Sequence, residues 1–404
     1  MNILFIHEID FFRKVVFEFH TLAELLSLAG HNVYVIDYES MWIKKNLLDF
    51  GTLRTKEVNV ARAYPEALVK LIRPGFIKIP ILSRMSAFLT HYWAIKRAIM
   101  EKKIDVIILY SVPTNGIQTV RLAKNFSVPV VFRSIDTLHQ LVSNPILSKI
   151  TYCMEKFVYS RADLVLTISP QLSEYVIGMG ASNVELLPLG VDTDLFHPDI
   201  SSNGIRHKWG LNDKDKVIVF VGTLPMFSGL DTFIPKFSYV LNEFPNAKLM
   251  IVGDGVQRPW LQGIIKTAGL EDHVIITGLQ PHEFISQYIN SADVCINTFP
   301  VSGATKDAFP TKIIQYMACG KPTVSLRLLG LKNIGQKQGI VYADNGIEFE
   351  IISLLKSDDR RQKLGQAALN YVRQTHSYDS VIKQLEYELE KLVKYEYSST
   401  KSQT

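Results

Sequence analysis

The chain has 404 residues and a mass of 45.8 kDa. This exceeds the roughly 250–300 residues at which a single hydrophobic core stops growing, so we expect two domains. Hydrophobic residues make up 47% and charged residues 21%, and no low-complexity tract interrupts them, which predicts a fully folded chain and excludes a disordered or collagen-like protein. The net charge of +5 is mild and the basic pairs lack interleaved aromatic residues, which excludes a nucleic-acid partner.

Three cysteines, Cys153, Cys295 and Cys319, lie far apart in the sequence. This spacing argues against a disulfide framework, a zinc site and a thioredoxin-like redox pair. The first residues enter an apolar strand directly, without the basic region, signal-length apolar core or cleavage site of an export signal. Both features predict a cytoplasmic protein.

Short β-branched runs alternate with segments of helical length along the whole chain. In the first half we expect buried parallel strands at Ile3–Ile6, Val33–Ile36, Val106–Leu109, Val128–Phe132 and Leu164–Thr167. The alternation then restarts, with strands expected at Val217–Val221, Leu249–Val252, Val274–Thr277, Val294–Asn297 and Pro322–Ser325. The pattern predicts an α/β protein made of two doubly wound, Rossmann-like domains.

Turn residues cluster midway along the chain, where the apolar periodicity lapses. We therefore expect an N-terminal domain at 1–197, a linker at 198–212 that acts as a hinge, and a C-terminal domain at 213–377. The remaining part, 378–404, begins with a long amphipathic helix that either caps the second domain or crosses back to the first. Ligands of open α/β sheets bind beyond the carboxyl ends of the strands, so we expect the two domains to face a central cleft.

Residues 41–105 hold 13 Lys and Arg against 5 Asp and Glu, an excess of 8. Within them, residues 79–93 mix apolar and aromatic side chains with Arg84, in a stretch too short and too interrupted to span a bilayer. One interpretation is a peripheral membrane surface that recruits an anionic lipid or a lipid-diphosphate acceptor. The other is a solvated helix face over ordinary core residues.

The most specific pattern is the segment 307–324, which lies between two expected strands. In Phe309 and the run Met317–Gly320 it resembles the donor-site signature of the family-four retaining glycosyltransferases, which have the GT-B fold. Further likenesses follow in family order over residues 184–375: Gly190–Asp192 with Phe196 and Pro198, Val221–Leu224 with Gly229–Asp231, Leu249–Gly255, Gly278, and Ser291–Asp293. The resemblance implies a GT-B protein that holds a nucleoside-diphosphate sugar as donor substrate, with no other cofactor.

The chemistry of the signature suits such a donor. A helix that begins near Pro310 and Thr311 presents free backbone N–H groups and the positive end of its dipole, and Lys312 adds a cation in the first turn. In the family two glutamates bind the sugar hydroxyls and the nucleoside ribose, and their positions correspond to Asp307 and Gln315. Asp is one methylene shorter than Glu and Gln lacks the charge, so both contacts are expected in altered form.

Two basic residues of the family are replaced in this chain. The family usually has an Arg after the glycine that matches Gly222 and a Lys before the glycine that matches Gly229, where they neutralise the diphosphate. The corresponding residues are Thr223 and Ser228. We retain Gly222, Thr223 and Ser228, together with Phe309, as donor-binding positions and expect the cation to come from elsewhere.

Three residues are candidates for that cation. Lys306 and Lys312 lie beside the signature. Arg133 directly follows an expected strand, so we expect it to point into the cleft from the opposite domain, and we prefer it on that ground. The alternative is an arginine that lies on the surface or supports other side chains.

In the first half the family often has a histidine at a strand end that contacts the sugar. Near the equivalent strand end this chain has Asp136 and His139, which are candidate catalytic residues or, alternatively, ordinary capping and solvated residues. His7 follows the first strand and also occupies a cleft position, and no glycine pair follows that strand.

The resemblance implies retaining, metal-independent transfer of a hexosyl unit to a glycan, a polyprenyl-linked or a glycolipid acceptor, at the cytoplasmic face of a membrane in the lipid-linked cases. The departing phosphate would take the acceptor's proton, so no protein base is needed. Asp192-Thr-Asp194 has the DxD form of metal-dependent transferases but lies in the expected hinge, so we predict no metal. The alternatives are a non-catalytic GT-B subunit or glycan-binding protein with a degenerate donor site, and a sugar-nucleotide epimerase.

Overall fold

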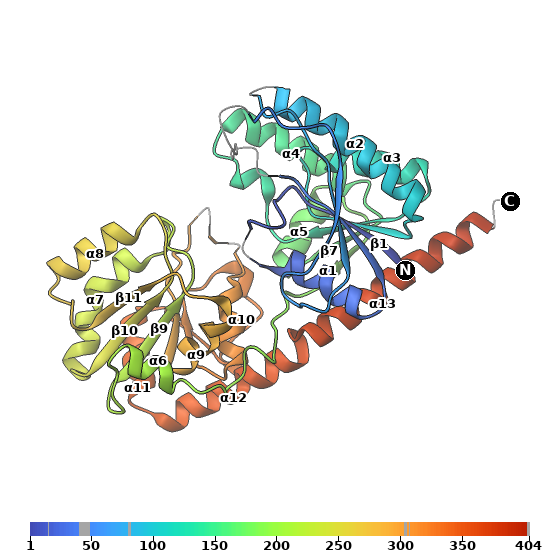
Figure 1. Ribbon diagram of the computed structural model, residues 1–404. Coiled ribbons are helices and arrows are strands. Elements are labelled where there is room, and N and C mark those ends of the chain that lie inside the picture. The colour runs from blue at the N-terminus through green and yellow to red at the C-terminus, as the bar shows by residue number, and fades with distance from the viewer. Residues whose placement is uncertain (15, 40–48, 80–81, 303–304, 307, 402–404) are drawn as a thin grey trace. The chain divides into compact units, whose positions relative to one another are not determined.

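The computed structural model describes residues 1–14, 16–39, 49–79, 82–302, 305–306 and 308–401. The chain divides into two compact units (Figure 1). Unit 1 comprises residues 1–187 and 382–404, and unit 2 comprises residues 188–381.

Unit 1 contains an eight-stranded sheet in the order β3-β4-β2-β1-β5-β6-β7-β8. All neighbouring pairs are parallel except β3 and β4. The strands are β1 (Asn2–Ile6), β2 (Asn32–Ile36), β3 (Lys56–Val60), β4 (Val69–Arg73), β5 (Val106–Leu109), β6 (Val130–Ser134), β7 (Leu164–Thr167) and β8 (Val184–Leu186). The expected strand at 128–132 therefore lies two residues further on, which places Arg133 inside β6.

Helices cover both faces of this sheet. They are α1 (Glu18–Leu28), α2 (Leu82–Lys102), α3 (Gly116–Asn125), α4 (Pro145–Tyr159) and α5 (Pro170–Gly178), with a 3₁₀ turn η1 at Leu138–Leu141. Leu4 and Ile6 join a core with buried residues of α2, α3, α4 and α5. Phe5 lies between them on the strand, so it points to the other face, where its ring contacts Phe19 of α1. Four helices thus cover one face, and α1 packs on the other.

Unit 2 contains a six-stranded, fully parallel sheet in the order β11-β10-β9-β12-β13-β14. The strands are β9 (Lys216–Val221), β10 (Ala247–Val252), β11 (Val274–Gly278), β12 (Val294–Asn297), β13 (Thr323–Ser325) and β14 (Ile340–Tyr342). The helices are α6 (Asn203–Lys208), α7 (Leu230–Glu243), α8 (Arg258–Thr267), α9 (Ile285–Asn290), α10 (Thr311–Ala318), α11 (Ile347–Leu355) and α12 (Asp358–Thr375), with 3₁₀ turns η2 (His282–Phe284), η3 (Leu329–Leu331) and η4 (Gln336–Gln338). Both sheets are doubly wound, as the alternating pattern predicted.

The residues around the expected linker pack within unit 2. Asn290 of α9 donates through Nδ2 to the His197 and Ile200 carbonyls at 2.9 and 3.0 Å, and Arg206 of α6 donates to the Ser291 carbonyl at 3.0 Å. These bonds hold the segment 198–212 to unit 2, and the division between the units lies earlier, at 187/188. A local lapse of apolar periodicity does not reveal hydrogen bonds to a distant helix.

The last helix, α13 (Tyr378–Lys401), connects the two units in sequence. Its first residues belong to unit 2, where Tyr378 N donates to the Val191 carbonyl at 3.1 Å. Its later residues belong to unit 1, where Gln384 Nε2 donates to the Leu186 carbonyl at 2.7 Å and Glu386 lies 2.9 Å from His31. Of the two courses that the sequence left open, the helix takes the one that returns to the first unit.

Each sheet has one point at which the winding direction reverses. In unit 1 the chain moves from β1 to β2 on one side and continues later at β5 on the other. In unit 2 the same reversal separates β9 from β12. Loops at the carboxyl ends of the two strands beside such a switch point are the usual ligand sites of open α/β sheets.

Candidate functional site

The loops after β9 and β10 are packed together by glycines. Gly222 N donates to the Val252 carbonyl and Leu224 N to the Asp254 carbonyl, both at 3.0 Å. A Cβ on Gly253, which has φ 153°, would collide with the Gly222 carbonyl. Gly253 therefore supports a close backbone approach in a tight strand-to-helix turn.

Lys312 lies at the switch point of unit 2, in the first turn of α10. Its side chain is 8% exposed, and its Nζ lies 3.7 Å from the ring centre of Phe220 and 4.3 Å from that of Phe299. Among the residues that the structure describes, Nζ has no hydrogen-bond partner. Burial lowers the pKa of the Lys312 amine well below its ordinary value. The amine is thus a buried basic group that lacks a described counter-charge, and burial favours its neutral form until an anion binds.

Gly222 borders this amine. Its φ is 141°, and a Cβ built on it would lie 3.0 Å from the Lys312 Nζ. A side chain here would be strained and would crowd the amine, so glycine keeps the approach to Nζ open. Gly222 and Lys312, separated by 90 residues in the sequence, therefore form one site at the ends of β9 and α10.

Tyr316 fixes α10 to the sheet one turn after Lys312. Its hydroxyl accepts a hydrogen bond from Val221 N at 2.7 Å and donates to the Ile296 carbonyl at 3.4 Å, and the side chain is fully buried. The tyrosine therefore connects the helix to both strands beside the switch point. We did not single out Tyr316 from the sequence, although its place in the signature one residue after Gln315 was a usable signal.

The other residues expected at the donor site have varied surroundings. Gln315 is half-buried, and its side chain makes no hydrogen bond among the described residues. Phe309 is also half-buried, with its ring 5.8 Å from that of His376. Lys306 is exposed, and its carbonyl accepts a hydrogen bond from Leu329 N at 2.5 Å. Asp307 lies outside the described residues.

The two residues that replace the family's basic pair differ from each other. Thr223 is exposed next to Gly222. Ser228 is fully buried; its hydroxyl donates to Gln257 and accepts from Leu230 N at 3.2 Å. The hydroxyl therefore holds the start of α7, and the expectation that Ser228 faces the donor stays a prediction.

Arg133 is held inside unit 1 and does not present a free guanidinium. It is 1% exposed, and its Nε and Nη2 donate to the two carboxylate oxygens of Glu18, both at 2.7 Å. Nη1 donates to the Leu187 carbonyl at 2.6 Å, and Tyr110 Oη donates to Glu18 Oε1 at 3.2 Å. Our preference for Arg133 as the donor-facing cation is therefore corrected: β6 extends to Ser134 and turns this side chain into a buried ion pair.

The other candidates of unit 1 lie at the carboxyl edge of its sheet. The Asp136 side chain is exposed at the surface. The surrounding protein nevertheless desolvates its carboxylate, and this desolvation raises the pKa of Asp136 to about 6. His139 Nδ1 lies 2.8 Å from an oxygen of Glu155, which is fully buried. His7 stacks on Tyr110 at 5.3 Å between ring centres, and burial is the main cause that lowers its pKa to about 3, so it is neutral at physiological pH.

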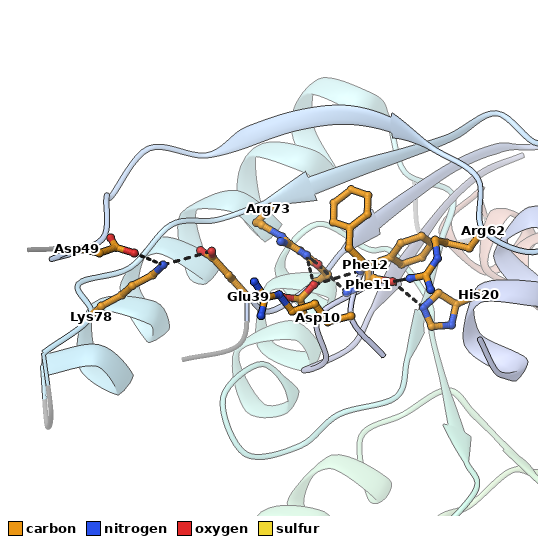
Figure 2. A network of polar contacts seen from close by, with 11 residues as sticks. Asp10, Phe11, Phe12, His20, Glu39, Asp49, Arg62, Arg73 and Lys78 are labelled. Atoms are coloured by element: carbon orange, nitrogen blue, oxygen red, sulfur yellow. Dashed lines mark hydrogen bonds and ion pairs between the residues drawn. The ribbon is translucent and has the colours of Figure 1, made fainter. Parts of the chain in front are cut away.

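The loop after β1 is fixed by charges rather than by glycines (Figure 2). Arg73, at the end of β4, pairs with Asp37 and with Asp10, the latter at 2.8 Å. Asp37 also accepts from Phe11 N at 3.0 Å, and the Phe11 carbonyl accepts from Arg62. This network explains how the loop keeps a defined course without the glycine pair. No spacing of residues along the chain predicts this network.

Acidic clusters do not suggest a metal ion. In the part of the chain that is described, no group of three or more His, Cys, Asp or Glu side chains is arranged to hold one. In the Asp192-Thr-Asp194 run, the Asp192 carboxylate accepts from Asp194 N and Leu195 N at 2.9 and 3.0 Å, so it shapes a turn. Among the described helices, none combines the length and apolar character needed to cross a bilayer.

Both units of the chain match known protein families. The family described as "Glycosyltransferase Family 4" matches residues 19–195. The family described as "Glycosyl transferases group 1" matches residues 201–371. Among curated relatives, the D-inositol 3-phosphate glycosyltransferase of Segniliparus rotundus is 25% identical over 195 residues, 46% of this chain and 42% of that protein. The GDP-mannose-dependent alpha-(1-6)-phosphatidylinositol monomannoside mannosyltransferase of Mycolicibacterium smegmatis is 32% identical over 171 residues, 41% of this chain and 44% of that protein. The chain thus matches less than half the length of these two relatives.

Solved structures extend the likeness to the whole fold. Sucrose-phosphate synthase from Thermosynechococcus elongatus matches with a TM-score of 0.71 and 19% identity, over 97% of this chain and 98% of that one. The Anabaena protein HepE in complex with UDP matches with a TM-score of 0.70 and 15% identity, over 97% and 100%. These matches confirm the GT-B fold.

Proposed function

The chain belongs to the group 1 glycosyltransferases of family four, and on that basis we propose that it is a glycosyltransferase. It takes a hexosyl unit from a nucleoside-diphosphate sugar and transfers it to a hydroxyl group of a glycan or a lipid-linked acceptor. The transfer retains the configuration at the anomeric carbon and requires no metal ion.

The observation that carries this proposal is the buried Lys312 amine. An ammonium group removed from water without a counter-charge is costly, and a residue that bears this cost is a candidate for ligand binding. A diphosphate supplies two or more negative charges to the same place. The amine borders Gly222 at the switch point of unit 2, where open α/β sheets bind ligands.

The neighbouring groups suit the rest of the donor. The first backbone N–H groups of α10 and the positive end of its dipole add to the attraction for the diphosphate. The side chain of Gln315, one turn further on, makes no hydrogen bond among the described residues and is assigned to the ribose, and we assign Asp307 to the hydroxyls of the sugar. Thr223 and Phe309 line this site, whereas Lys306 is a second cation at its margin.

The chemistry follows from charge and position. As the bond to the sugar breaks, negative charge accumulates on the leaving diphosphate, and Lys312 with the start of α10 stabilises it. The bond from the acceptor oxygen to the anomeric carbon forms on the same face, and the leaving phosphate oxygen takes the acceptor's proton. Asp136 and His139 help to position the acceptor. Arg133 acts through Glu18 on the shape of unit 1 and does not touch the donor.

The first test is a thermal-shift panel of nucleoside diphosphates and their sugars, since a ligand that binds only the folded state raises its stability. We expect one nucleotide class to raise the melting temperature of the natural chain and to have little effect on Lys312→Met. Lys321→Met is the matched control, because Lys321 is also largely buried but its Nζ donates to the Asn290 carbonyl at 2.9 Å. A panel without any shift would refute the donor site.

The second test is turnover with the donor so identified. Product anomers read by NMR distinguish retention from inversion, and equal rates with and without a chelator support metal independence. A rate that falls to zero with the chelator would contradict it.

One observation favours a second candidate, a GT-B protein that binds a donor or glycan without turnover. The family's two diphosphate-binding basic residues are replaced by Thr223 and Ser228 in this chain, and Ser228 is fully buried. This candidate predicts nucleotide binding without hydrolysis or transfer of the sugar, so the turnover assay separates it from the enzyme.

We also propose that the protein works in the cytoplasm. All three cysteines are unpaired, and burial raises the pKa of Cys319 to about 12, which makes its thiol inert. Unpaired cysteines are typical of reducing compartments. Fractionation of the source cells checks this location, and recovery of the protein outside the cytoplasm would contradict it.

A further inference from the structure

A cavity of about 540 Å³ lies at the amino edge of the unit 1 sheet, at the opposite end of the strands from the loops described above. Its walls come from the second half of α3, the segment 127–130 that leads into β6, the end of α4, and Asp163 just before β7. The helices α3 and α4 are neighbours on one face of the sheet (Figure 1). The volume falls within the range of about 300–1,000 Å³ that small-molecule sites occupy.

Three cations border this cavity. Arg121 and Lys124 lie on α3, three residues apart and therefore on one side of the helix, and Arg161 follows the end of α4. In the part of the chain that the structure describes, none of the three forms an ion pair. The Arg161 guanidinium donates to the Phe157 carbonyl at 3.3 Å and to the Ser160 hydroxyl at 3.0 Å, which are both neutral acceptors. These hydrogen bonds orient the guanidinium but do not balance its charge.

The ring of Phe157 holds two of these cations near each other. The Cζ atom of Arg161 lies 3.7 Å from the centre of this ring, and the Cζ atom of Arg121 lies 5.3 Å from it. A guanidinium is attracted to an aromatic face and keeps its outer N–H groups available for hydrogen bonds. Two positive charges beside one ring repel each other, and an anion that binds between them removes this repulsion.

Asp163, the acidic residue of the lining, has another role. Its Oδ2 accepts a hydrogen bond from Val130 N at 2.8 Å, and its backbone N–H donates to the Val130 carbonyl at 2.9 Å. The carboxylate therefore fixes the start of β6 beside β7. Burial is the main cause that raises the pKa of the Asp163 carboxyl. With three basic residues and one acidic residue in its lining, the cavity keeps an excess of positive charge.

The ends of the two helices account for part of this arrangement, because the negative end of a helix dipole favours cations. They do not account for the hollow, since packed helices normally fill the space between them. The chain leaves α3 through Ser127, whose φ is 52°, a left-handed conformation that few residues other than glycine adopt. Ser127 lines the cavity, and its hydroxyl has no hydrogen-bond partner among the described residues. A hollow bordered by cations and a hydroxyl is suited to an anionic ligand.

We propose that this cavity binds a small organic phosphate. The phosphate oxygens accept hydrogen bonds from the two guanidinium groups, from the Lys124 ammonium group and from the Ser127 hydroxyl. The organic part lies against the Phe157 ring and the apolar residues that precede β6. The site lies within unit 1 and shares no residue with the proposed donor site of unit 2, so the proposal does not depend on the proposed transfer reaction.

Titration calorimetry of the full chain tests the proposal with two probes, glycerol 3-phosphate and inorganic phosphate. Sodium chloride keeps the ionic strength constant, because surface cations also attract anions without a site. We expect saturable binding of both probes, with the higher affinity for glycerol 3-phosphate. Arg121→Gln and Arg161→Gln should each weaken this binding by about tenfold, since each removes a charged donor. Arg161→Lys keeps the charge but loses the paired donors, and it should weaken binding by about threefold.

The matched control is Arg373→Gln, because Arg373 is also an exposed arginine in the last turn of a helix, α12, and lies outside the cavity lining. Arg373→Gln and Lys312→Met should both bind glycerol 3-phosphate like the natural chain, and circular dichroism checks that every variant is folded. No saturable binding of either probe, or equal losses in Arg373→Gln and the two cavity variants, would overturn the proposal. Binding that persists in both cavity variants and disappears in Lys312→Met would also overturn it, since the phosphate would then belong to unit 2.

Discussion

The buried ionisable groups near the two switch points differ in whether they have a partner of opposite charge. In unit 1 the charged groups near the switch point have partners: Glu18 holds Arg133, and Asp37 holds Arg73. In unit 2 the Lys312 amine is buried between two aromatic rings without a described counter-charge. Paired charges fix the course of loops, whereas a buried amine without a described partner can gain a proton and bind an anionic ligand. The contrast separates residues that shape a site from residues that bind within it.

The largest effect is expected from breaking the charge pair of unit 1. Glu18→Gln leaves the Arg133 guanidinium buried without a counter-charge and should lower the free energy of unfolding by about 3–5 kcal/mol. Urea denaturation measures it. Asp359→Asn is the control, since the Asp359–Lys363 pair is 74% and 76% exposed, and it should cost less than about 0.5 kcal/mol. Similar losses in both variants would show that Arg133 does not depend on Glu18.

Removal of the unpaired charge of unit 2 should have the opposite effect on stability. Lys312→Met removes a costly buried amine and should leave the free energy of unfolding equal or raise it by about 1 kcal/mol. At the same time, nucleoside-diphosphate affinity should fall by about 100-fold, which calorimetry measures.

Lys321→Met provides the comparison, because its amine has a partner. It should lose stability by about 1 kcal/mol and keep its nucleotide affinity. A Lys312→Met chain that unfolds more easily and still binds the nucleotide would place Lys312 with the structural charges.

Gly222→Ala tests the space over the amine. We expect a cost in stability of about 1–2 kcal/mol from the strained backbone and a fall in nucleotide affinity of about tenfold, since the new Cβ crowds Lys312 Nζ. Gly269→Ala is matched in having positive φ, 64°, with no neighbour within 4 Å of a new Cβ. It should cost about 1 kcal/mol and leave affinity unchanged. Equal affinities in the two variants would contradict the proximity of Gly222 to bound donor.

The smallest effect concerns protons. The folded chain holds the Lys312 pKa below its ordinary value of 10.5, so between the two values the unfolded state binds more protons and stability rises with pH. A bound diphosphate favours the charged amine and raises its pKa, so binding in this window should take up as much as about one proton. Calorimetry in two buffers of different ionisation heat measures the uptake. Uptake that persists in Lys312→Met would assign the proton to another group.

Local sequence pattern was enough for most of the fold. Continuous β-branched runs such as Val106–Leu109 and Leu164–Thr167 predicted their strands to the residue, because strands buried on both faces of a parallel sheet require such runs. The pattern missed β3, four of whose five residues are exposed, since an edge strand carries little apolar signal. It also misplaced β6 by two residues, and with it the surroundings of Arg133.

The sequence by itself determined the two doubly wound domains and the family resemblance of segment 307–324, because periodicity and a spaced signature are properties of neighbouring residues. It also gave Lys312 and Gly222 as separate positions. Only the tertiary structure decided that these two residues meet and that Arg133 is neutralised by Glu18 across 115 residues. Burial and charge pairing depend on segments brought together by folding, and no spacing along the chain records them.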